Sequence, residues 1–396
     1  MRLRVVTIWR KELVNINKTR DNHLARFGQH FDHTLLVRKD KQIGAHVSSY
    51  GTKVHTINPG RFGFITFWLK TLFWLRKNIA QNNIDAIVLP IGEEPLILPI
   101  RWLLCRNHTP HLILDLWDVP GLALDGSDQN ISKAALRKVY LWLLPNLINT
   151  ADTVVSGVVN KPFIHMGIPK HRIINTENGV NIEHFDPATP SSDLWSHLPP
   201  PTQKTVRLLY QGYIHEARGS VAIVDIVSEL RAHGHDVQLL LVGPSEPNQI
   251  SNLHTACSDN NIQEYVSILE SIDSHKIPGV IAGADICLCP LANIDKFRWS
   301  YPVKIYEYMS MGKAVVASKL PGIETMIKSK SVGGCLYNPV EFRNMSDSIK
   351  WLIENPQQHQ SIAKSGYEYA QTKSWGKIIS QLAEKIDSNI IGGRSA

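Results

Sequence analysis

Cysteine is scarce in this sequence, with five cysteines among 396 residues. They are widely spread and show neither the paired spacing of a zinc site nor the pattern of a disulfide framework. A small secreted fold held by disulfides is therefore excluded, and we expect a reducing compartment. The five are Cys105, Cys257, Cys287, Cys289 and Cys335.

Long hydrophobic runs are also missing. The first 13 residues hold only a few apolar residues between charges, which is too few for the apolar region of a signal peptide. The two most apolar segments, 61–77 and 99–106, are too short and too charged to span a bilayer, which needs about 20 apolar residues. With 43% hydrophobic and 19% charged residues and no low-complexity tract, the chain is expected to fold throughout.

Acidic residues are few in the first half of the chain. Residues 1–200 contain 23 Lys and Arg against 16 Asp and Glu, whereas residues 201–396 contain 19 of each. The whole net charge of +7 therefore lies in the first half. Such a one-sided excess indicates an anionic partner, unless it is only uneven surface charge. An anionic membrane is favoured over nucleic acid, because no helix combines dense Lys and Arg with polar residues that read bases.

Short apolar runs alternate with helical patterns along the chain, beginning with LRVVTIW, HTLLV and DAIVLPI. This alternation predicts doubly wound α/β structure with parallel sheets. A Pro- and Ser-rich stretch interrupts the pattern, which then restarts with VRLLYQGY. We expect an N-terminal domain over 1–190, a linker over 191–204 and a C-terminal domain over 205–373, with ligands bound at the carboxyl ends of the strands in a central cleft.

The segment 61–77, RFGFITFWLKTLFWLRK, combines aromatic and aliphatic side chains with four basic residues. This composition suits a helix that lies in the headgroup region of an anionic membrane. The alternative is an ordinary helix whose apolar stripe faces the protein core.

The strongest motif is SYPVKIYEYMSMGKAVVAS, residues 300–318. Tyr301-Pro302 ends the preceding chain, a helix follows, Gly312 ends that helix, and AVVAS is a buried strand. Lys304 and Glu307 are three residues apart and share one helical face. There an ammonium can meet a phosphate, and a carboxylate can accept hydrogen bonds from both hydroxyls of a ribose. The alternative is a surface ion pair.

These residues resemble the C-terminal motif of the family 4 glycosyltransferases and their GT-B relatives, S-x-P-x-K-x-x-E-Y-M-x-x-G followed by a Val-rich strand. The resemblance implies the GT-B fold, in which two Rossmann-like domains face a cleft. It also implies that Ser300 and Lys304 bind the phosphate or sugar of a nucleotide sugar and that Glu307 binds its ribose. Many members carry a further glutamate where this chain has Trp299, so the resemblance does not define the donor sugar.

A second stretch, LLYQGYIHEARGS, resembles the loop with which the family grips the diphosphate. By this resemblance Gly212 allows the backbone to approach the donor and Arg218 holds the usual basic position. Tyr213 stands where relatives have an arginine. A guanidinium can bond two phosphate oxygens at once, so Arg218 partly replaces that missing cation. The resemblance also implies that a last helix, 374–390, packs back on the N-terminal domain.

The N-terminal domain is expected to hold the acceptor and any catalytic base. The strand HLILDLW delivers Asp115 and Asp118 to its carboxyl end. The chain has some likeness here to an inverting relative, the xanthan-type glucuronosyltransferase, which uses an aspartate as base. Asp118 matches that position best, with Asp115 as the second candidate. The alternative for Asp118 is a turn or helix cap.

The sequence thus predicts a hexosyltransferase that moves a hexosyl or uronosyl residue from a nucleoside diphosphate sugar to a lipid-linked or oligosaccharide acceptor in envelope or exopolysaccharide biosynthesis. We expect no metal or other cofactor, since helix ends and basic side chains meet the diphosphate charge in this architecture. The expected location is the inner face of the cytoplasmic membrane, peripherally bound through 61–77. Two alternatives stay open: a GT-B epimerase or synthase acting on soluble sugars, and a GT-B-like sugar-binding protein without turnover.

Overall fold

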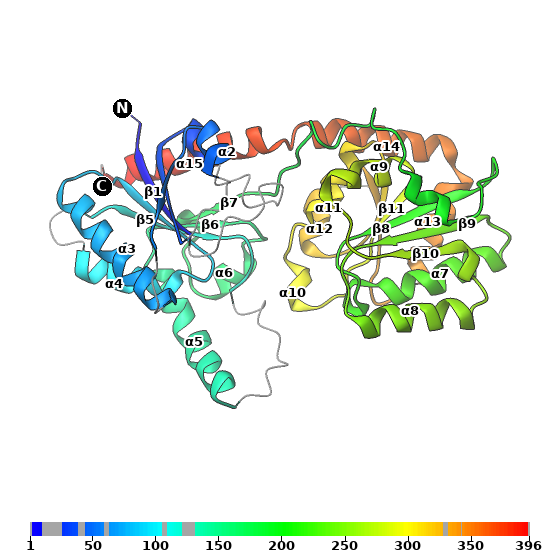
Figure 1. Ribbon diagram of the computed structural model, residues 1–396, viewed down its shortest axis with the longest axis horizontal. Coiled ribbons are helices and arrows are strands. Elements are labelled where there is room, and N and C mark those ends of the chain that lie inside the picture. Colours follow the sequence, from blue (N-terminus) through cyan, green and yellow to red (C-terminus); the bar gives the residue numbers. More distant parts are fainter. Residues whose placement is uncertain are drawn as a thin grey trace. The chain divides into compact units, whose positions relative to one another are not determined.

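A computed structural model describes residues 2–9, 26–38, 44–58, 63–104, 109–120, 131–327, 332–341 and 343–394. The chain divides into two compact units (Figure 1). Unit 1 consists of Met1–Asn178 and Trp375–Ala396, and unit 2 of Gly179–Ser374. Arg61, Phe62 and Cys105, which the sequence analysis considered, lie outside the described residues.

Unit 1 is built on a parallel sheet. Its described strands have the order β3-β2-β1-β4-β5-β6-β7 and all pair in parallel. They are β1 (Arg4–Trp9), β2 (Asp32–Val37), β3 (Lys53–Thr56), β4 (Ala86–Pro90), β5 (His111–Leu116), β6 (Thr153–Ser156) and β7 (Ile173–Asn175). The order reverses between β1 and β4, which is the point where a doubly wound sheet leaves a crevice at its strand ends.

The helices of unit 1 connect these strands. The described helices are α2 (Gly44–Ser49), α3 (Gly63–Ala80), α4 (Ile97–Pro99), α5 (Ile131–Asn149), α6 (Lys161–His165) and α15 (Trp375–Arg394), with shorter turns η1 (Phe27–Gln29), η3 (Glu94–Leu96), η4 (Ile100–Leu104) and η5 (Lys170–Arg172). Among the described residues, no helix is both long and apolar enough to cross a bilayer.

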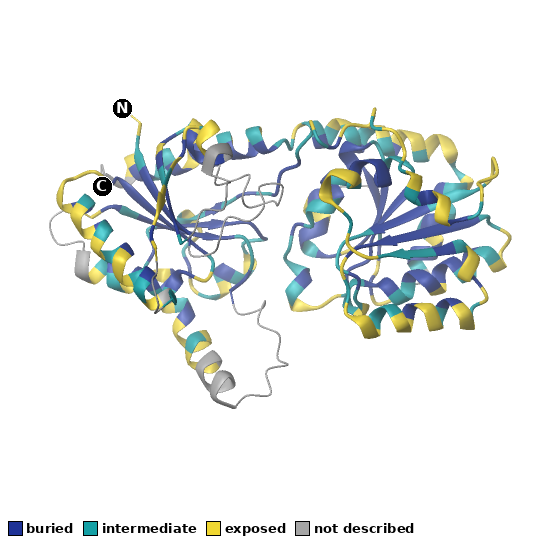
Figure 2. Cartoon of the chain, in the orientation of Figure 1, coloured by how far each residue is buried: buried dark blue, intermediate teal, exposed yellow. Residues whose placement is uncertain are grey.

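Unit 2 repeats the same plan. Its strands have the order β10-β9-β8-β11-β12-β13, again all parallel, with the reversal between β8 and β11. They are β8 (Val206–Gln211), β9 (Val237–Val242), β10 (Val266–Leu269), β11 (Ile286–Cys289), β12 (Ala314–Ser318) and β13 (Gly334–Tyr337). Strands β9, β11 and β12 are buried along their whole length because helices cover both faces of the sheet (Figure 2).

Eight helices of unit 2 fall within the described residues, together with four 3-10 turns. The helices are α7 (Ser220–Ala232), α8 (Pro247–Asp259), α9 (Ile277–Ala282), α10 (Asp295–Arg298), α11 (Val303–Ser310), α12 (Pro321–Met326), α13 (Arg343–Glu354) and α14 (Pro356–Gln371). The turns are η6 (Asp193–His197), η7 (Glu216–Arg218), η8 (Gln263–Tyr265) and η9 (Ser274–Lys276).

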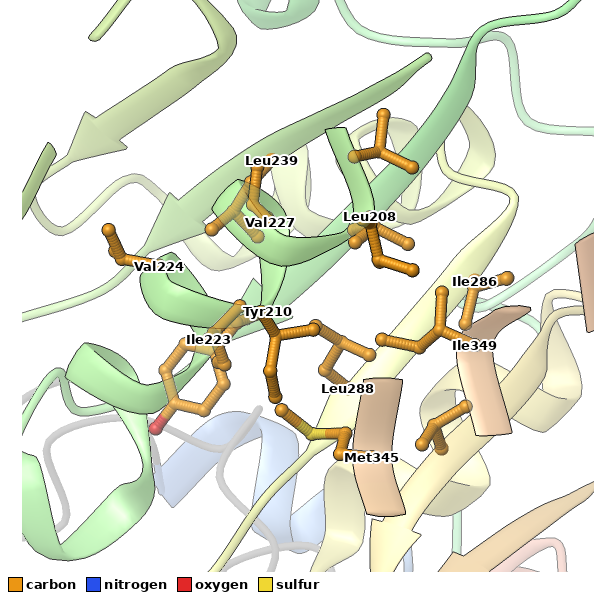
Figure 3. Packing of buried hydrophobic residues seen from close by; sticks show 14 of the residues in the cluster. Leu208, Tyr210, Ile223, Val224, Val227, Leu239, Ile286, Leu288, Met345 and Ile349 are labelled. Atoms are coloured by element: carbon orange, nitrogen blue, oxygen red, sulfur yellow. The ribbon is translucent and has the colours of Figure 1, made fainter. Parts of the chain in front are cut away.

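The core of unit 2 lies between the sheet and helices α7 and α13 (Figure 3). Each fully buried aliphatic side chain there contributes roughly 1.5–3 kcal/mol relative to an exposed one. The cluster includes Leu208 and Tyr210 from β8, Leu239 from β9, Ile286 and Leu288 from β11, Ile223, Val224 and Val227 from α7, and Met345 and Ile349 from α13. This packing anchors β8 and β11, whose carboxyl ends carry the candidate site.

Helix α15 comes from the end of the chain and belongs to unit 1. Its apolar side, from Trp375 to Ile390, packs in one cluster with residues of β1, β4, β5 and β6. Trp375 is 3% exposed, and its ring lies 6.1 Å from that of Trp117. The helix expected over 374–390 is observed over Trp375–Arg394.

The observed division of the chain differs from the predicted one. The boundary lies between Asn178 and Gly179, so the predicted linker 191–204 and the residues just before it form part of unit 2. Trp195 is 2% exposed and donates a hydrogen bond from Nε1 to the carbonyl of Val280, and Ser310 Oγ donates to the carbonyl of Phe185. A Pro- and Ser-rich composition argues against a regular element, but it does not exclude packing through one buried indole.

Candidate active site

The candidate site of unit 2 is formed where β8 ends, beside the start of α11. The turn after β8 contains Gly212, whose φ of +127° is a conformation that L side chains rarely adopt. An added Cβ at Gly212 would lie 2.7 Å from Lys304 Nζ. The backbone conformation therefore favours glycine, and any larger residue would also push the Lys304 ammonium away.

Lys304 points its ammonium into this turn. Its Nζ is buried, has no hydrogen-bond partner among the described residues, and lies 4.2 Å from the ring centre of Tyr210. Burial lowers the pKa of Lys304 to about 8, although the nearby Cys289 and Glu307 act in the opposite direction. An enclosed cation that meets the face of an aromatic ring and donates no hydrogen bond keeps its donors for an anionic ligand.

Glu307 lies one helical turn after Lys304 on α11. Its Oε2 accepts a hydrogen bond of 2.5 Å from Gln211 Nε2, and the backbone N–H of Gln211 donates to Tyr308 Oη at 3.0 Å. Burial raises the pKa of Glu307 to about 7, while Gln211 and Lys304 favour the charged form. Gln211 thus holds the carboxyl group in place at the end of β8.

Arg218 is the second cation of the site. It ends η7, and Gly219 follows with φ +77° against the carbonyl of Pro290, which an added Cβ would meet at 2.4 Å. The guanidinium lies 5.0 Å from the ring centre of Phe297. Its charge contributes to lowering the pKa of Lys304, which adds to the positive potential at this site.

Ser300 and Tyr213 have protein partners of their own. Ser300 Oγ donates to the carbonyl of Phe297 at 2.9 Å, and Tyr213 Oη donates to Glu246 Oε1 at 3.1 Å. The structure therefore brings together Gly212, Lys304, Glu307 and Arg218, while the hydroxyls of Ser300 and Tyr213 are used within the protein.

Sequence reasoning missed Gln211 and Tyr210. The sequence shows Gln211 only as the last residue of a strand, and its contact with Glu307 bridges 96 residues. Tyr210 looks like a core residue, and its ring is indeed buried. Only the pairing of β8 with β11 and the position of α11 reveal that this ring lies beneath the lysine.

The two candidates in unit 1 have different surroundings. Asp115, at the end of β5, is 1% exposed and accepts a hydrogen bond from Trp117 Nε1. Asp118 is half-buried, and its Oδ1 accepts from the backbone N–H of Val119 at 3.1 Å. Asp115 is therefore placed to hold Trp117, whereas Asp118 is the more accessible carboxylate.

Two further carboxylates of unit 1 were missed. Glu93 and Glu94 follow β4 and are 4% and 0% exposed. Glu93 Oε2 accepts from Trp68 Nε1 at 3.1 Å, and both oxygens of Glu94 accept from the backbone N–H of Gly92. Within the described ranges, no group of three or more His, Cys, Asp or Glu side chains could hold a metal ion.

Solved structures identify the fold. HepE of Anabaena in complex with UDP and glucose superimposes with a TM-score of 0.71 and 18% identity, covering 97% of this chain and 99% of that one. A glycosyltransferase from Rickettsia africae does so with a TM-score of 0.74 and 15% identity, covering 98% and 99%. The protein therefore has the GT-B fold, as predicted.

The sequence comparisons identify the domain that carries the site. Residues 205–355, which lie in unit 2, match the family model of the glycosyl transferases group 1. Two curated relatives are the phosphatidyl-myo-inositol mannosyltransferase of Mycobacterium leprae, 22% identical over 209 residues, and the lipopolysaccharide 1,2-N-acetylglucosaminetransferase of Salmonella typhimurium, 21% identical over 251 residues. The matches cover 53% and 60% of this chain and 52% and 62% of those proteins, so the chain spans about half the length of its curated relatives.

Proposed function

We propose that this protein is a glycosyltransferase that moves a hexosyl or uronosyl residue from a nucleoside diphosphate sugar to a saccharide acceptor. The observation that carries the proposal is the enclosed, unpartnered Lys304 ammonium beside the Glu307 carboxyl group at the strand-order reversal of unit 2. Burying a charge without a partner costs several kcal/mol, and packing alone would favour an apolar side chain there. A ligand with both phosphate and diol groups accounts for both residues.

Each donor-binding residue then has a defined task. Lys304 and Arg218 bind the diphosphate and stabilise the charge that develops on it as the sugar leaves. Glu307, oriented by Gln211, accepts hydrogen bonds from the ribose hydroxyls. Gly212 lets the backbone approach the phosphates. In this proposal the two cations make a metal unnecessary, and family 4 is the class of group 1 transferase that the motif favours.

Unit 1 supplies the acceptor side in this proposal. Asp118 is the candidate base that deprotonates the acceptor hydroxyl, which an inverting transfer requires. Asp115 supports it indirectly by fixing Trp117, the residue directly before Asp118.

The proposed acceptor is lipid-linked, and the proposed location is the inner face of the cytoplasmic membrane in envelope or exopolysaccharide biosynthesis. Relatives named for phosphatidyl-myo-inositol and for lipopolysaccharide support this assignment. The apolar and basic helix α3, which contains most of the segment 61–77, supports it independently.

Nucleotide binding tests the proposal. We expect UDP or GDP to raise the unfolding temperature of the wild-type protein, by the equivalent of about 2.7 kcal/mol at a nucleotide concentration of 100 Kd. Glu307→Ala is expected to lose this response, and Glu307→Gln, which keeps the size of the side chain, serves if the alanine variant does not fold. Glu324→Ala, which removes an exposed carboxylate on α12, is the matched control.

The proposal fails if neither nucleotide stabilises the wild type, or if both Glu307 variants respond as the wild type does. Transfer of sugar to a soluble sugar or sugar phosphate, with no product on a lipid, would instead assign the protein as a GT-B synthase.

A further inference from the structure

Exposed apolar side chains gather on three neighbouring elements of unit 1. Of the twelve large apolar side chains that the described residues expose, nine belong to α3, to the α4–η4 segment 97–104 and to α5. They are Ile65, Leu69, Phe73, Leu98, Trp102, Val139, Leu141, Trp142 and Leu143. Helix α3 contacts η4, which follows α4 directly, and α5 contacts η3, which precedes α4. We refer to these nine residues as the apolar face.

Helix α3 is apolar on two opposite sides. Phe67, Thr71, Leu75 and Ile79 recur every four residues and are buried. Ile65, Leu69 and Phe73 recur at the same spacing and are 55%, 53% and 70% exposed. An offset of two residues places the two stripes roughly 200° apart around the helix. Core packing therefore explains the first stripe and leaves the second without a partner.

The buried pair Glu93 and Glu94 connects the outer helices of this face. Glu93 accepts a hydrogen bond from Trp68 of α3, and Glu94 accepts one from Tyr140 of α5. Both glutamates are almost fully buried, so these bonds are shielded from water and are costly to break. The two helices are thus held at one end of β4 as parts of one surface.

The charged residues within the three elements are all basic, and one of them, Arg101, is paired with Asp152. The three elements contain seven Lys and Arg and no Asp or Glu. Arg76 and Lys77 are exposed and lie three and four residues after Phe73, on the same face of α3, and Lys138 is exposed beside Val139 on α5. Exposed tryptophans with a basic surround are typical of proteins that insert into the headgroup region of anionic bilayers.

We infer that the apolar face as a whole docks on an anionic lipid bilayer, with Trp102 and Trp142 as its main anchors. These residues are 79% and 74% exposed and lie outside α3, so the docking surface extends well beyond the segment 61–77. A second copy of the chain fits this face poorly, because a two-fold contact would bring the basic residues of both copies together. The inference depends on the proposed function in one respect, because that function places the acceptor at a membrane.

Vesicle binding tests the inference on the full-length protein. We expect flotation with vesicles of phosphatidylcholine and phosphatidylglycerol, weak binding to phosphatidylcholine alone, and release at high salt. The double variant Trp102→Ser/Trp142→Ser is expected to bind at least about tenfold more weakly, since each ring removes apolar area from water on docking. Val340→Ser/Ile391→Ser removes two exposed apolar side chains elsewhere and is the matched control.

Fluorescence tests the identity of the anchors. Lipids brominated in their acyl chains should quench wild-type tryptophan emission, and most of that quenching should disappear in Trp102→Ser/Trp142→Ser. The inference is overturned if the wild type does not float with anionic vesicles, or if the double variant floats and is quenched as the wild type is. It is also overturned if the same variant abolishes a dimer in the absence of lipid. Stabilisation by UDP or GDP is measured in parallel, so that a failure here is distinguished from a failure of donor binding.

Discussion

At the scale of single residues, Lys304 and Glu307 share an environment that suits neither charge without a ligand. Burial lowers the pKa of the lysine to about 8 and raises that of the glutamate to about 7, so each charged form is less favourable here than in water. Each residue keeps part of its surface in contact with solvent, and Gln211 supports the carboxyl group. Such a pair is kept at a cost in stability, which is typical of a binding site.

This cost predicts a pH dependence. Between pH 4.5 and 7 the folded protein keeps the Glu307 proton, whereas the unfolded chain releases it. The unfolded state therefore binds fewer protons, and stability falls as pH rises through this window. Relative to Glu307→Gln, whose side chain does not titrate, wild-type stability should fall by about 1–2 kcal/mol, less than the full pKa shift because solvent reaches the side chain. Urea unfolding of both proteins at several pH values measures this, and a constant difference would contradict it.

Asp118 and Asp115 should respond differently to the same change. Asp118→Asn is expected to slow sugar transfer by roughly 10²–10⁴-fold without changing nucleotide binding, because only a carboxylate accepts the acceptor proton. Asp115→Asn should mainly lower stability, since Asp115 is buried and accepts from Trp117. Transfer of labelled sugar to a lipid extract, compared with thermal unfolding, separates the two effects. Full transfer by Asp118→Asn would leave Asp118 as a turn residue that bonds Val119.

At the scale of elements, the ends of β8 and β9 meet at the candidate site. Gly243 follows β9 with φ +154°, and an added Cβ there would lie 1.9 Å from the carbonyl oxygen of Gly212. The two strand ends therefore contact each other through backbone atoms, with no side chain between them. The N–H groups of Gly212 and Gly243 donate to the carbonyls of Val242 and Leu269, so the unpartnered Lys304 ammonium is the group that favours an anion here.

Gly212→Ala tests that arrangement against a matched glycine. Gly212 has φ +127° and lies against Lys304, whereas Gly234 has φ +86° and no atom within 4 Å of an added Cβ. Both substitutions should cost about 1–2 kcal/mol of backbone strain. Only Gly212→Ala should also abolish stabilisation by UDP or GDP, because its methyl group displaces the lysine. Equal nucleotide responses of the two variants would contradict this assignment.

Helix α3 shows that an amphipathic pattern does not by itself identify which side of a helix faces the core. The sequence allowed either a core-packed helix or a membrane-facing one for 61–77, and the structure shows one buried stripe and one exposed apolar stripe on opposite sides of α3. The residues between the two stripes, such as Trp68 and Trp74, are half-buried. Aromatic side chains spread around a helix hide its period, so the pattern could not assign one face to the core.

At the scale of the whole molecule, two units are joined by two crossings of the chain, after Asn178 and after Ser374. These crossings lie side by side, because the N–H of Val180 donates to the carbonyl of Lys373 at 2.9 Å. The chain then continues into α15, which completes the core of unit 1. Unit 1 is therefore built from both ends of the sequence.

Trp375→Ala should weaken unit 1 selectively. The side chain is 3% exposed within the cluster that α15 shares with the sheet, so its removal should cost about 3–5 kcal/mol. The nucleotide-responsive unfolding of unit 2 should be unchanged. Trp142→Ala, which removes a side chain that is 74% exposed, should change stability by less than about 0.5 kcal/mol. Calorimetry with and without UDP resolves the two units, and a parallel loss of both transitions would contradict this prediction.

Local sequence was sufficient to predict the parallel α/β architecture. With the help of a family resemblance it also predicted the α11 motif with Lys304 and Glu307, and a last helix that packs on the N-terminal domain. Hydrophobic periodicity and the residues that end a helix are features of neighbouring residues in the chain. The 19 residues 300–318 are therefore enough to show them. Tertiary structure alone decided the unit boundary, through the burial of Trp195, and brought Gln211 to Glu307 and Tyr210 to Lys304. It also joined α3, η4 and α5 into one exposed apolar face. These features depend on contacts between residues far apart in the chain, and such contacts leave no local pattern.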